Sequence, residues 1–267
     1  MASNDAPMTV NRVALTVRDL DRVGDFYQTA IGLAALRRDG ESLVLGIGST
    51  PLLELRRDPA AVFAPRGAGL FHTAFLLPER ADLGRWMRHA IGRGLRIDGA
   101  SNHLVSEAAY LRDPEGNGIE IYADRPRAEW QTDGTRVKMT SLPLDVQGLM
   151  QTAPGEWRDA PEGTVIGHVH LQVGDLAAAE AFYAGTLGFD VTERSPGATF
   201  YATGGYHHHL ATNTWRSAGA GARALGTAGL AELVLGVAPG AGPAGAAFAD
   251  PWGNRVTLEP AGLARAA

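Results

Sequence analysis

The sequence contains no cysteine among its 267 residues. This absence excludes disulfides, cysteine-ligated zinc or iron–sulfur sites and a thiol nucleophile, so any metal must bind His, Asp or Glu. No apolar run approaches the roughly 18 residues that a membrane helix needs. The first residues also lack the charged and then apolar segments of a secretion signal. We therefore expect a cytoplasmic protein without a membrane partner.

Blocks of consecutive Lys and Arg are absent too, and the formal net charge is −5, so nucleic acid is not expected as a partner. The chain is 45% hydrophobic and 20% charged, which is typical of a globular protein with a buried core. Its 34 glycines exceed the usual share of about 7% and indicate many turns between short strands. The length suggests two domains.

The chain repeats itself. The segment VNRVALTVRDLDRVGDFYQTAIGL (10–33) matches IGHVHLQVGDLAAAEAFYAGTLGF (166–189) without a gap. Each copy opens with apolar and polar residues in alternation, which predicts a strand. An N-capping Asp, Asp19 or Asp175, then precedes about three turns of helix that end near a glycine.

A second repeat pairs GLFHTAFLLP (69–78) with GLAELVLGVAP (229–239), and each copy leads to a DP-x-GN turn and a further strand. The sequence therefore predicts four modules that read strand, helix and then several strands. They cover about residues 8–60, 69–126, 163–215 and 229–260. In the fourth module APGAGPAGAA replaces the counterpart of the predicted helix Glu79–Gly94, so we expect that module to lack its helix.

The segment between the second and third modules contains Pro, Gly and polar residues with little periodicity, as a connection between domains does. We therefore predict an N-terminal domain over 8–126, a linker over 127–162 and a C-terminal domain over 163–262.

Four long strings, GLFHTAFLLPERADLGRW, NHLVSEAAYLRDPEGNGIEIYADRP, GHVHLQVGDLAAAEAFY and GGYHHHLATNTWRSAGA, resemble the vicinal oxygen chelate superfamily. That superfamily includes glyoxalase I, bleomycin resistance proteins and type I extradiol dioxygenases, and the strings are most similar to its two-domain, catechol 2,3-dioxygenase-like branch. The resemblance implies an α+β fold in which four βαβββ modules pair into two half-open β-cups. A divalent metal would lie on strand residues inside a cup.

The resemblance further implies a metal-dependent extradiol dioxygenase that cleaves the ring of a catechol-type diol. Its partners would be a small aromatic substrate and dioxygen, and its cofactor Fe(II). Such chemistry needs two His and one carboxylate on one face of the metal, with coordination positions left open.

The ligand positions of the superfamily lie at the start of the first strand and late in the last strand of each module. In the third module these positions fall on His168 and on the triplet 207–209, where alignment with the first module sets His209 opposite Glu54. His170 shares a strand face with His168, and we interpret it as a structural polar residue.

The fourth module departs from the dioxygenase pattern, because Glu232 replaces a second His and Thr257 replaces the carboxylate. We therefore predict a metal site of His168, His209 and Glu232. Type I extradiol enzymes also carry their acid/base His near the triplet, and we assign this role to His207, since imidazole titrates near pH 7.

The first half offers an alternative metal set of Glu54, His72 and Glu120. Arg12 occupies a ligand position there, and its cation would repel a metal or pair with Glu54 or Glu120. In the second case the first half would be a salt-bridged remnant of a duplicated cup. Carboxylate-rich ligation would favour Mn²⁺, Ni²⁺ or Zn²⁺ as a Lewis acid for a glyoxalase-like isomerase or lyase. A metal-free, resistance-type binding protein is the third reading.

Some features have two interpretations. His103 is expected to have a hydrogen-bonded structural role, and the Gly/Ala-rich loop 217–229 is either a lid over the cup or a connector. Four aromatic residues either wall a substrate site or fill the core: Tyr201, Tyr206, Trp215 and Trp252. The sequence leaves open the substrate, the metal and the half of the chain that carries the site. It also leaves open the oligomeric state, which includes a homo-oligomer.

Overall fold

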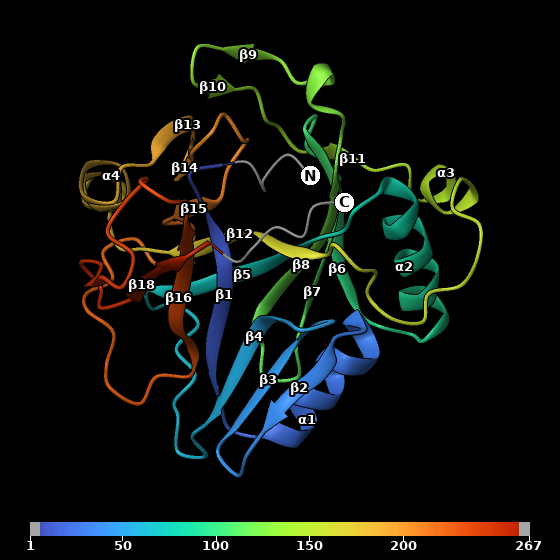
Figure 1. Cartoon of the computed structure of the whole chain (residues 1–267), viewed down its shortest axis with the longest axis horizontal. Helices are drawn as coiled ribbons and strands as arrows, with labels where there is room; N and C mark the ends of the chain where they lie inside the picture. Colours follow the sequence, from blue (N-terminus) through green and yellow to red (C-terminus); the bar gives the residue numbers. More distant parts are fainter. Residues whose placement is uncertain (1–5, 262–267) are drawn as a thin grey trace.

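The computed structural model describes residues 6–261. It contains two large curled sheets and a few short helices (Figure 1), so the α+β expectation is confirmed. Two parts of the sequence-based interpretation lie outside the described residues, namely the first five residues and residue 262, where the predicted C-terminal domain ends. Within the described part of the chain, no helix is long and apolar enough to cross a membrane.

The smaller of the two large sheets has seven strands. Their order across the sheet is β17 (Ala247–Ala249), β18 (Arg255–Pro260), β16 (Gly229–Val237), β1 (Met8–Val17), β4 (Thr50–Arg57), β3 (Ser42–Ile47) and β2 (Ala34–Arg38).

The larger sheet has nine strands. Their order is β11 (Leu142–Pro143), β6 (Ile97–Asn102), β7 (Ser106–Arg112), β8 (Gly118–Asp124), β5 (Gly69–Leu76), β12 (Val165–Gln172), β15 (Leu210–Asn213), β14 (Ala198–Ala202) and β13 (Asp190–Ser195). A separate hairpin joins β9 (Thr132–Asp133) to β10 (Arg136–Val137).

The predicted N-caps are confirmed. The Asp19 side chain accepts the backbone N–H of Arg22 ahead of α1 (Leu20–Phe26), and Asp175 accepts that of Ala178 ahead of α4 (Leu176–Glu180), which satisfies backbone donors that a helix start leaves unpaired. The π-helical turns η1 (Tyr27–Ile31) and η3 (Ala181–Thr186) continue these helices. The remaining helices are α2 (Arg80–Gly92), the 3₁₀ turn η2 (Arg127–Glu129) and α3 (Val146–Gln151).

Strand pairing differs from that expected for two separate domains. The first strand of module one, β1, pairs antiparallel with β16 of module four, and β5 of module two pairs with β12 of module three. Figure 1 shows β1 beside β16 and β5 beside β12. Each large sheet therefore contains strands from both halves of the chain, so hydrogen bonding does not separate the halves predicted at residues 8–126 and 163–262.

This pairing between the halves arises because the first strand of every module has one edge that no strand of its own module pairs with. Within its own module each of these strands pairs only with the last strand, in parallel: β1 with β4, β5 with β8, β12 with β15 and β16 with β18. Its other edge must find an unpaired neighbour. Since all four copies have this same edge, the repeat alone does not specify which two meet.

The fourth module has no helix between β16 and β17, where residues 238–246 form turns, as its shortened sequence predicted. The segment after residue 126, expected to be an irregular linker, contains η2, β9, β10, β11 and α3. Its β11 extends the nine-stranded sheet through β6. This segment thus supplies an edge strand of that sheet.

Candidate metal centre

Three strands of the larger sheet bring a histidine, a glutamate and a second histidine together. Ala74 on β5 lies opposite Glu120 on β8 and opposite His168 on β12. Residues opposite one another across strands share a face of the sheet, and so do residues two apart on one strand. His72, two residues before Ala74, therefore points to the same face, and the small Ala74 side chain leaves the space between the three polar groups open.

The three donor atoms form a nearly regular triangle. Glu120 Oε2 lies 3.0 Å from His72 Nε2 and 3.1 Å from His168 Nε2, and the two nitrogens lie 3.3 Å apart. All three residues are buried. Within residues 6–261 this is the one group of three His, Asp or Glu side chains close enough to hold a metal ion together.

This triangle fits a divalent transition metal. Donor atoms that bind an ion at about 2.1 Å and at right angles to one another lie about 3.0 Å apart, close to the three distances observed. Two imidazoles and one carboxylate on one face of the ion leave the opposite positions open, which is the donor set of non-haem Fe(II) oxygenases. The residues present therefore fit the metal that the sequence resemblance implies.

The protonation states also suit a metal. Burial lowers the pKa of His168 to about 4, so its imidazole is neutral at neutral pH and its lone pair can bind an ion. Burial alone would raise the pKa of Glu120, but the adjacent His168 and His72 lower it well below its usual value. The carboxylate is therefore ionised and supplies the negative charge that a divalent cation needs.

Close backbone packing holds these strands in place. A Cβ atom on Gly118, the residue opposite His72 on β8, would lie 2.0 Å from the carbonyl oxygen of Phe71. Any side chain there would push β8 away from β5 and so separate Glu120 from His72. Glycine at this position lets the two ligand-bearing strands approach.

The structure does not bring together the predicted set of His168, His209 and Glu232. Glu232 lies on β16 in the other sheet, where Arg255, Arg56 and Thr257 donate hydrogen bonds to its carboxylate. His209 is fully buried and packs against Tyr206 and Phe189, with ring centroids 4.8 and 6.5 Å away. Of this set, only His168 belongs to the triangle.

The alternative set of Glu54, His72 and Glu120 is also divided between the sheets. Glu54 lies on β4, where Arg56 donates to it at 3.0 and 3.1 Å and Arg12 approaches to 3.8 Å. His72 and Glu120 belong to the triangle. Each half of the chain thus contributes to one candidate site: two candidate ligands from the first half and one from the second.

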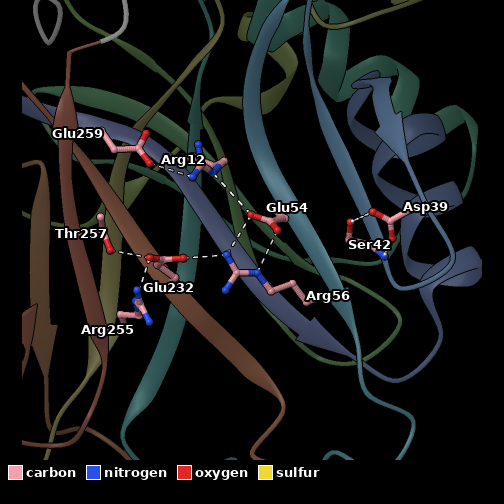
Figure 2. Close-up of polar contacts among 9 residues, drawn as sticks. All are labelled: Arg12, Asp39, Ser42, Glu54, Arg56, Glu232, Arg255, Thr257 and Glu259. Atoms are coloured by element: carbon pink, nitrogen blue, oxygen red, sulfur yellow. Dashed lines mark hydrogen bonds and ion pairs between the residues drawn. The ribbon is translucent and has the colours of Figure 1, made fainter. Parts of the chain in front are cut away.

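The equivalent place in the seven-stranded sheet holds guanidinium groups. Figure 2 shows Arg56 between the carboxylates of Glu54 and Glu232, with Arg12 on Glu54 and Glu259. Arg12 thus pairs with one of the two partners expected for it. These guanidinium cations neutralise Glu54 and Glu232, which lie opposite Ala14 of β1, as Glu120 and His168 lie opposite Ala74 of β5.

A cavity of about 570 Å³ opens beside the triangle and is lined by all three of its residues. Its lining also includes Met139, Thr140 and Ser141, which belong to the segment predicted as a linker. No residue of the loop 217–229, a candidate lid, lines this cavity within the described part of the chain. The segment after β10 therefore lines the cavity, whereas no described residue of that loop does.

His208 lines this cavity, whereas His207, the predicted acid/base residue, lies behind it. His207 Nε2 is 2.9 Å from Asp124 Oδ1, and its Nδ1 is 2.8 Å from His208 Nδ1. An ionised carboxylate only accepts hydrogen bonds, so His207 donates through Nε2. In a neutral His207 the other nitrogen, Nδ1, then accepts the Nδ1–H of His208. Nε2 of His208 is then left without a proton, and burial lowers the pKa of His208 well below its usual value.

His103 also lines the cavity and is hydrogen-bonded as predicted. Its Nδ1 lies 2.8 Å from the carbonyl oxygen of Thr140, and its Nε2 lies 2.6 Å from the hydroxyl of Tyr110. Burial, together with the charge of Glu120 and a hydrogen bond to it, raises the pKa of Tyr110 well above its usual value. Tyr110 is therefore a neutral hydroxyl between a candidate metal ligand and the cavity wall. Its contact with Glu120 depends on cross-strand pairing, which no local sequence signal encodes.

Of the four aromatic residues considered as a substrate wall, Trp215 lines the cavity. The others pack elsewhere: Tyr201 bonds to Thr212, Tyr206 to Tyr122, and Trp252 to the carbonyl oxygen of Ala220. For these three, core packing is the correct interpretation.

Comparison with known proteins adds the evolutionary relationship. The profile of the Glyoxalase/Bleomycin resistance protein/Dioxygenase superfamily matches residues 9–121 and 165–238. The chain belongs to this superfamily. It is also 43% identical over 224 residues to a Bacillus subtilis (strain 168) protein named catechol-2,3-dioxygenase, and the match covers 81% of this chain and 78% of the relative.

Solved structures of this superfamily show the same fold. Glyoxalase I from Zea mays superposes with a TM-score of 0.57 at 18% identity, over 95% of this chain and 92% of that chain. A putative dioxygenase from Bacillus subtilis superposes with a TM-score of 0.62 at 12% identity, over 97% and 88% of the two chains.

Proposed function

We propose that this protein is a metal-dependent extradiol dioxygenase that uses Fe(II) to cleave the ring of a catechol-type aromatic diol. The observation that carries the proposal is the triangle of His72, Glu120 and His168 on the wall of a cavity large enough for an aromatic substrate. The relative named catechol-2,3-dioxygenase supports the same reaction class.

His72, Glu120 and His168 would hold the ion. When bound, Fe(II) would supply open coordination positions for two vicinal oxygens and the redox chemistry that joins an aromatic diol to dioxygen. The protein contributes a buried site, in which the negative charge of Glu120 acts in a lower dielectric than in water.

In the proposed reaction His208 is the base. Its unprotonated Nε2 would accept the proton of one diol hydroxyl, because Nδ1–H is engaged with His207. Asp124 holds His207 in the tautomer that this requires. Since His208 lines the cavity and its ring centroid lies 4.1 Å from that of His168, the base and a metal ligand face the same substrate.

Tyr110 would position the substrate. The carbonyl oxygen of Thr140 accepts the Nδ1–H of His103, so in the neutral imidazole Nε2 accepts the O–H of Tyr110. The oxygen of Tyr110 can then accept a hydrogen bond from a diol hydroxyl without adding charge beside the metal. Because Thr140 belongs to the segment after β10, this chain of contacts also connects that segment to the candidate metal site.

The test is ring cleavage by iron-loaded protein. Protein loaded with Fe(II) without air and then mixed with catechols and oxygen should consume oxygen and form a yellow semialdehyde, since cleavage outside the two hydroxyls leaves that product. Glu120→Gln should abolish both signals, and Glu232→Gln, which changes a carboxylate of the other sheet, should retain them. Failure of protein with one iron per chain to consume oxygen with any catechol would overturn the proposal.

A further inference from the structure

One buried histidine in the cavity wall has no role in the proposed reaction. His170 lies on β12 two residues after His168, is 4% exposed and lines the cavity. Its Nε2 atom is buried without a hydrogen-bond partner among the described residues. Buried polar atoms are nearly always paired, and an orphan usually indicates a partner supplied by water or ligand.

Aromatic rings surround this imidazole. The ring centroids of Phe71, Trp215 and Phe200 lie 5.1, 5.2 and 6.0 Å from that of His170, and all three residues line the same cavity. The phenyl rings carry no hydrogen-bonding group, and the Trp215 indole N–H is already given to the carbonyl oxygen of Pro196. These three rings therefore form an aromatic box that offers the His170 imidazole no hydrogen bond.

The box adjoins the metal triangle. The His170 ring centroid is 5.1 Å from that of His72. A diol held at the triangle would therefore carry its ring, or a substituent on that ring, into the box. A cavity of about 570 Å³ falls within the range of roughly 300–1,000 Å³ that buries drug-sized ligands, so it holds more than a single-ring diol.

We propose that His170 determines substrate specificity by hydrogen-bonding a hydroxyl or carbonyl group carried on the aromatic substrate, so that the preferred substrate is a catechol with a polar substituent. The assignment of the diol rests on the proposed function. The contact with His170 rests on the orphaned Nε2 and the aromatic box around it. A hydroxyl suits this position best, because it both donates and accepts and so pairs with either tautomer of the imidazole.

Binding of two matched aromatic probes tests this proposal independently of ring cleavage. 2-Naphthol and 2-methylnaphthalene differ by a hydroxyl in place of a methyl group, and neither is a vicinal diol. Equilibrium dialysis against the metal-loaded protein without oxygen gives a Kd for each. We expect His170→Phe to reduce the preference for 2-naphthol by about five- to tenfold, the loss that one hydrogen bond to a buried group accounts for.

Two further variants separate hydrogen bonding from packing. His170→Gln restores a polar group of similar reach and should recover most of the preference. Phe200→Leu alters the box without removing a hydrogen-bonding group, so it should weaken both probes alike. Thermal unfolding of each variant confirms that it is folded.

An unchanged preference in His170→Phe would overturn the proposal, as would failure of 2-naphthol to bind the wild-type protein. These results are distinct from failure of the proposed function. If catechols are not cleaved but the preference depends on His170, the specificity contact stands without the dioxygenase. If catechols are cleaved but the preference is independent of His170, the dioxygenase stands without the contact.

Discussion

Replacing Glu120 by Gln is the most direct test of the candidate metal centre. The side chain keeps its shape but loses the negative charge, in a position that is 2% exposed. Both imidazoles remain, so the change isolates the carboxylate. Loss of a partner outside the ligand shell already costs about 10- to 100-fold in metal affinity, so loss of the ligand charge itself should cost more than about 100-fold.

The size of the effect follows from linkage between binding and folding. An ion present at about 100 times its Kd stabilises the folded state by about 2.7 kcal/mol, which corresponds to a rise in Tm of about 5–10 °C for a chain of this size. If Glu120→Gln raises the Kd about 100-fold, the same ion concentration stabilises the variant by only about 0.4 kcal/mol. The Tm should then rise by about 1 °C.

The assay is thermal unfolding with and without Mn(II), or Fe(II) under anaerobic conditions, at an ion concentration set from the wild-type Kd. Glu232→Gln is the matched control, because it makes the same chemical change at a part-buried carboxylate that hydrogen-bonds to Arg56. It should keep the full metal-dependent rise.

Two results would refute this reasoning. A full rise in Glu120→Gln would show that the carboxylate does not hold the ion. Loss of the rise in Glu232→Gln but not in Glu120→Gln would place the ion in the seven-stranded sheet.

Three further predictions follow from the same contacts. Asp124→Asn should lower kcat with catechol by about 10- to 100-fold at unchanged metal content, because His208 loses its fixed tautomer; an unchanged kcat would contradict that role. In metal-free protein, His168 takes up a proton more readily when unfolded, since folding lowers its pKa from 6.5 to about 4. Urea unfolding should therefore show the free energy of unfolding falling by about 1.6 kcal/mol between pH 6.5 and 5, and His168→Gln should flatten this dependence. Arg56→Gln should cost about 1 kcal/mol, discounted for a side chain 39% exposed; adding Glu232→Gln should recover part of that loss, and a neutral single variant would show that the ion pair contributes nothing.

The local parts of the fold could be predicted from the sequence. Alternation of apolar residues marked the first strand of each repeat, and Asp19 and Asp175 marked the starts of α1 and α4. The shortened fourth module correctly predicted a missing helix. These features depend on residues a few positions apart, where periodicity and capping act directly.

The histidine triplet shows where local rules fail. Regular alternation would set His207 and His209 on one face, but residues 203–209 form turns and bends, and β15 begins only at Leu210. The backbone there leaves the extended conformation, so side-chain direction no longer has a period of two. His208, which alternation would have turned away from its neighbours, therefore lines the cavity.

The sequence by itself determined the modules, their strands and capped helices, and the residue types able to bind a metal; His72, Glu120 and His168 each stood at a recognisable ligand position. Only the tertiary structure decided that these three meet, because it pairs the second module with the third and the first with the fourth. His72 and His168 are 96 residues apart in the chain, and their contact depends on the register of β5 and β12. Equivalent edges occur in all four modules, so the choice among them depends on the packing of the whole chain and is encoded in no single repeat.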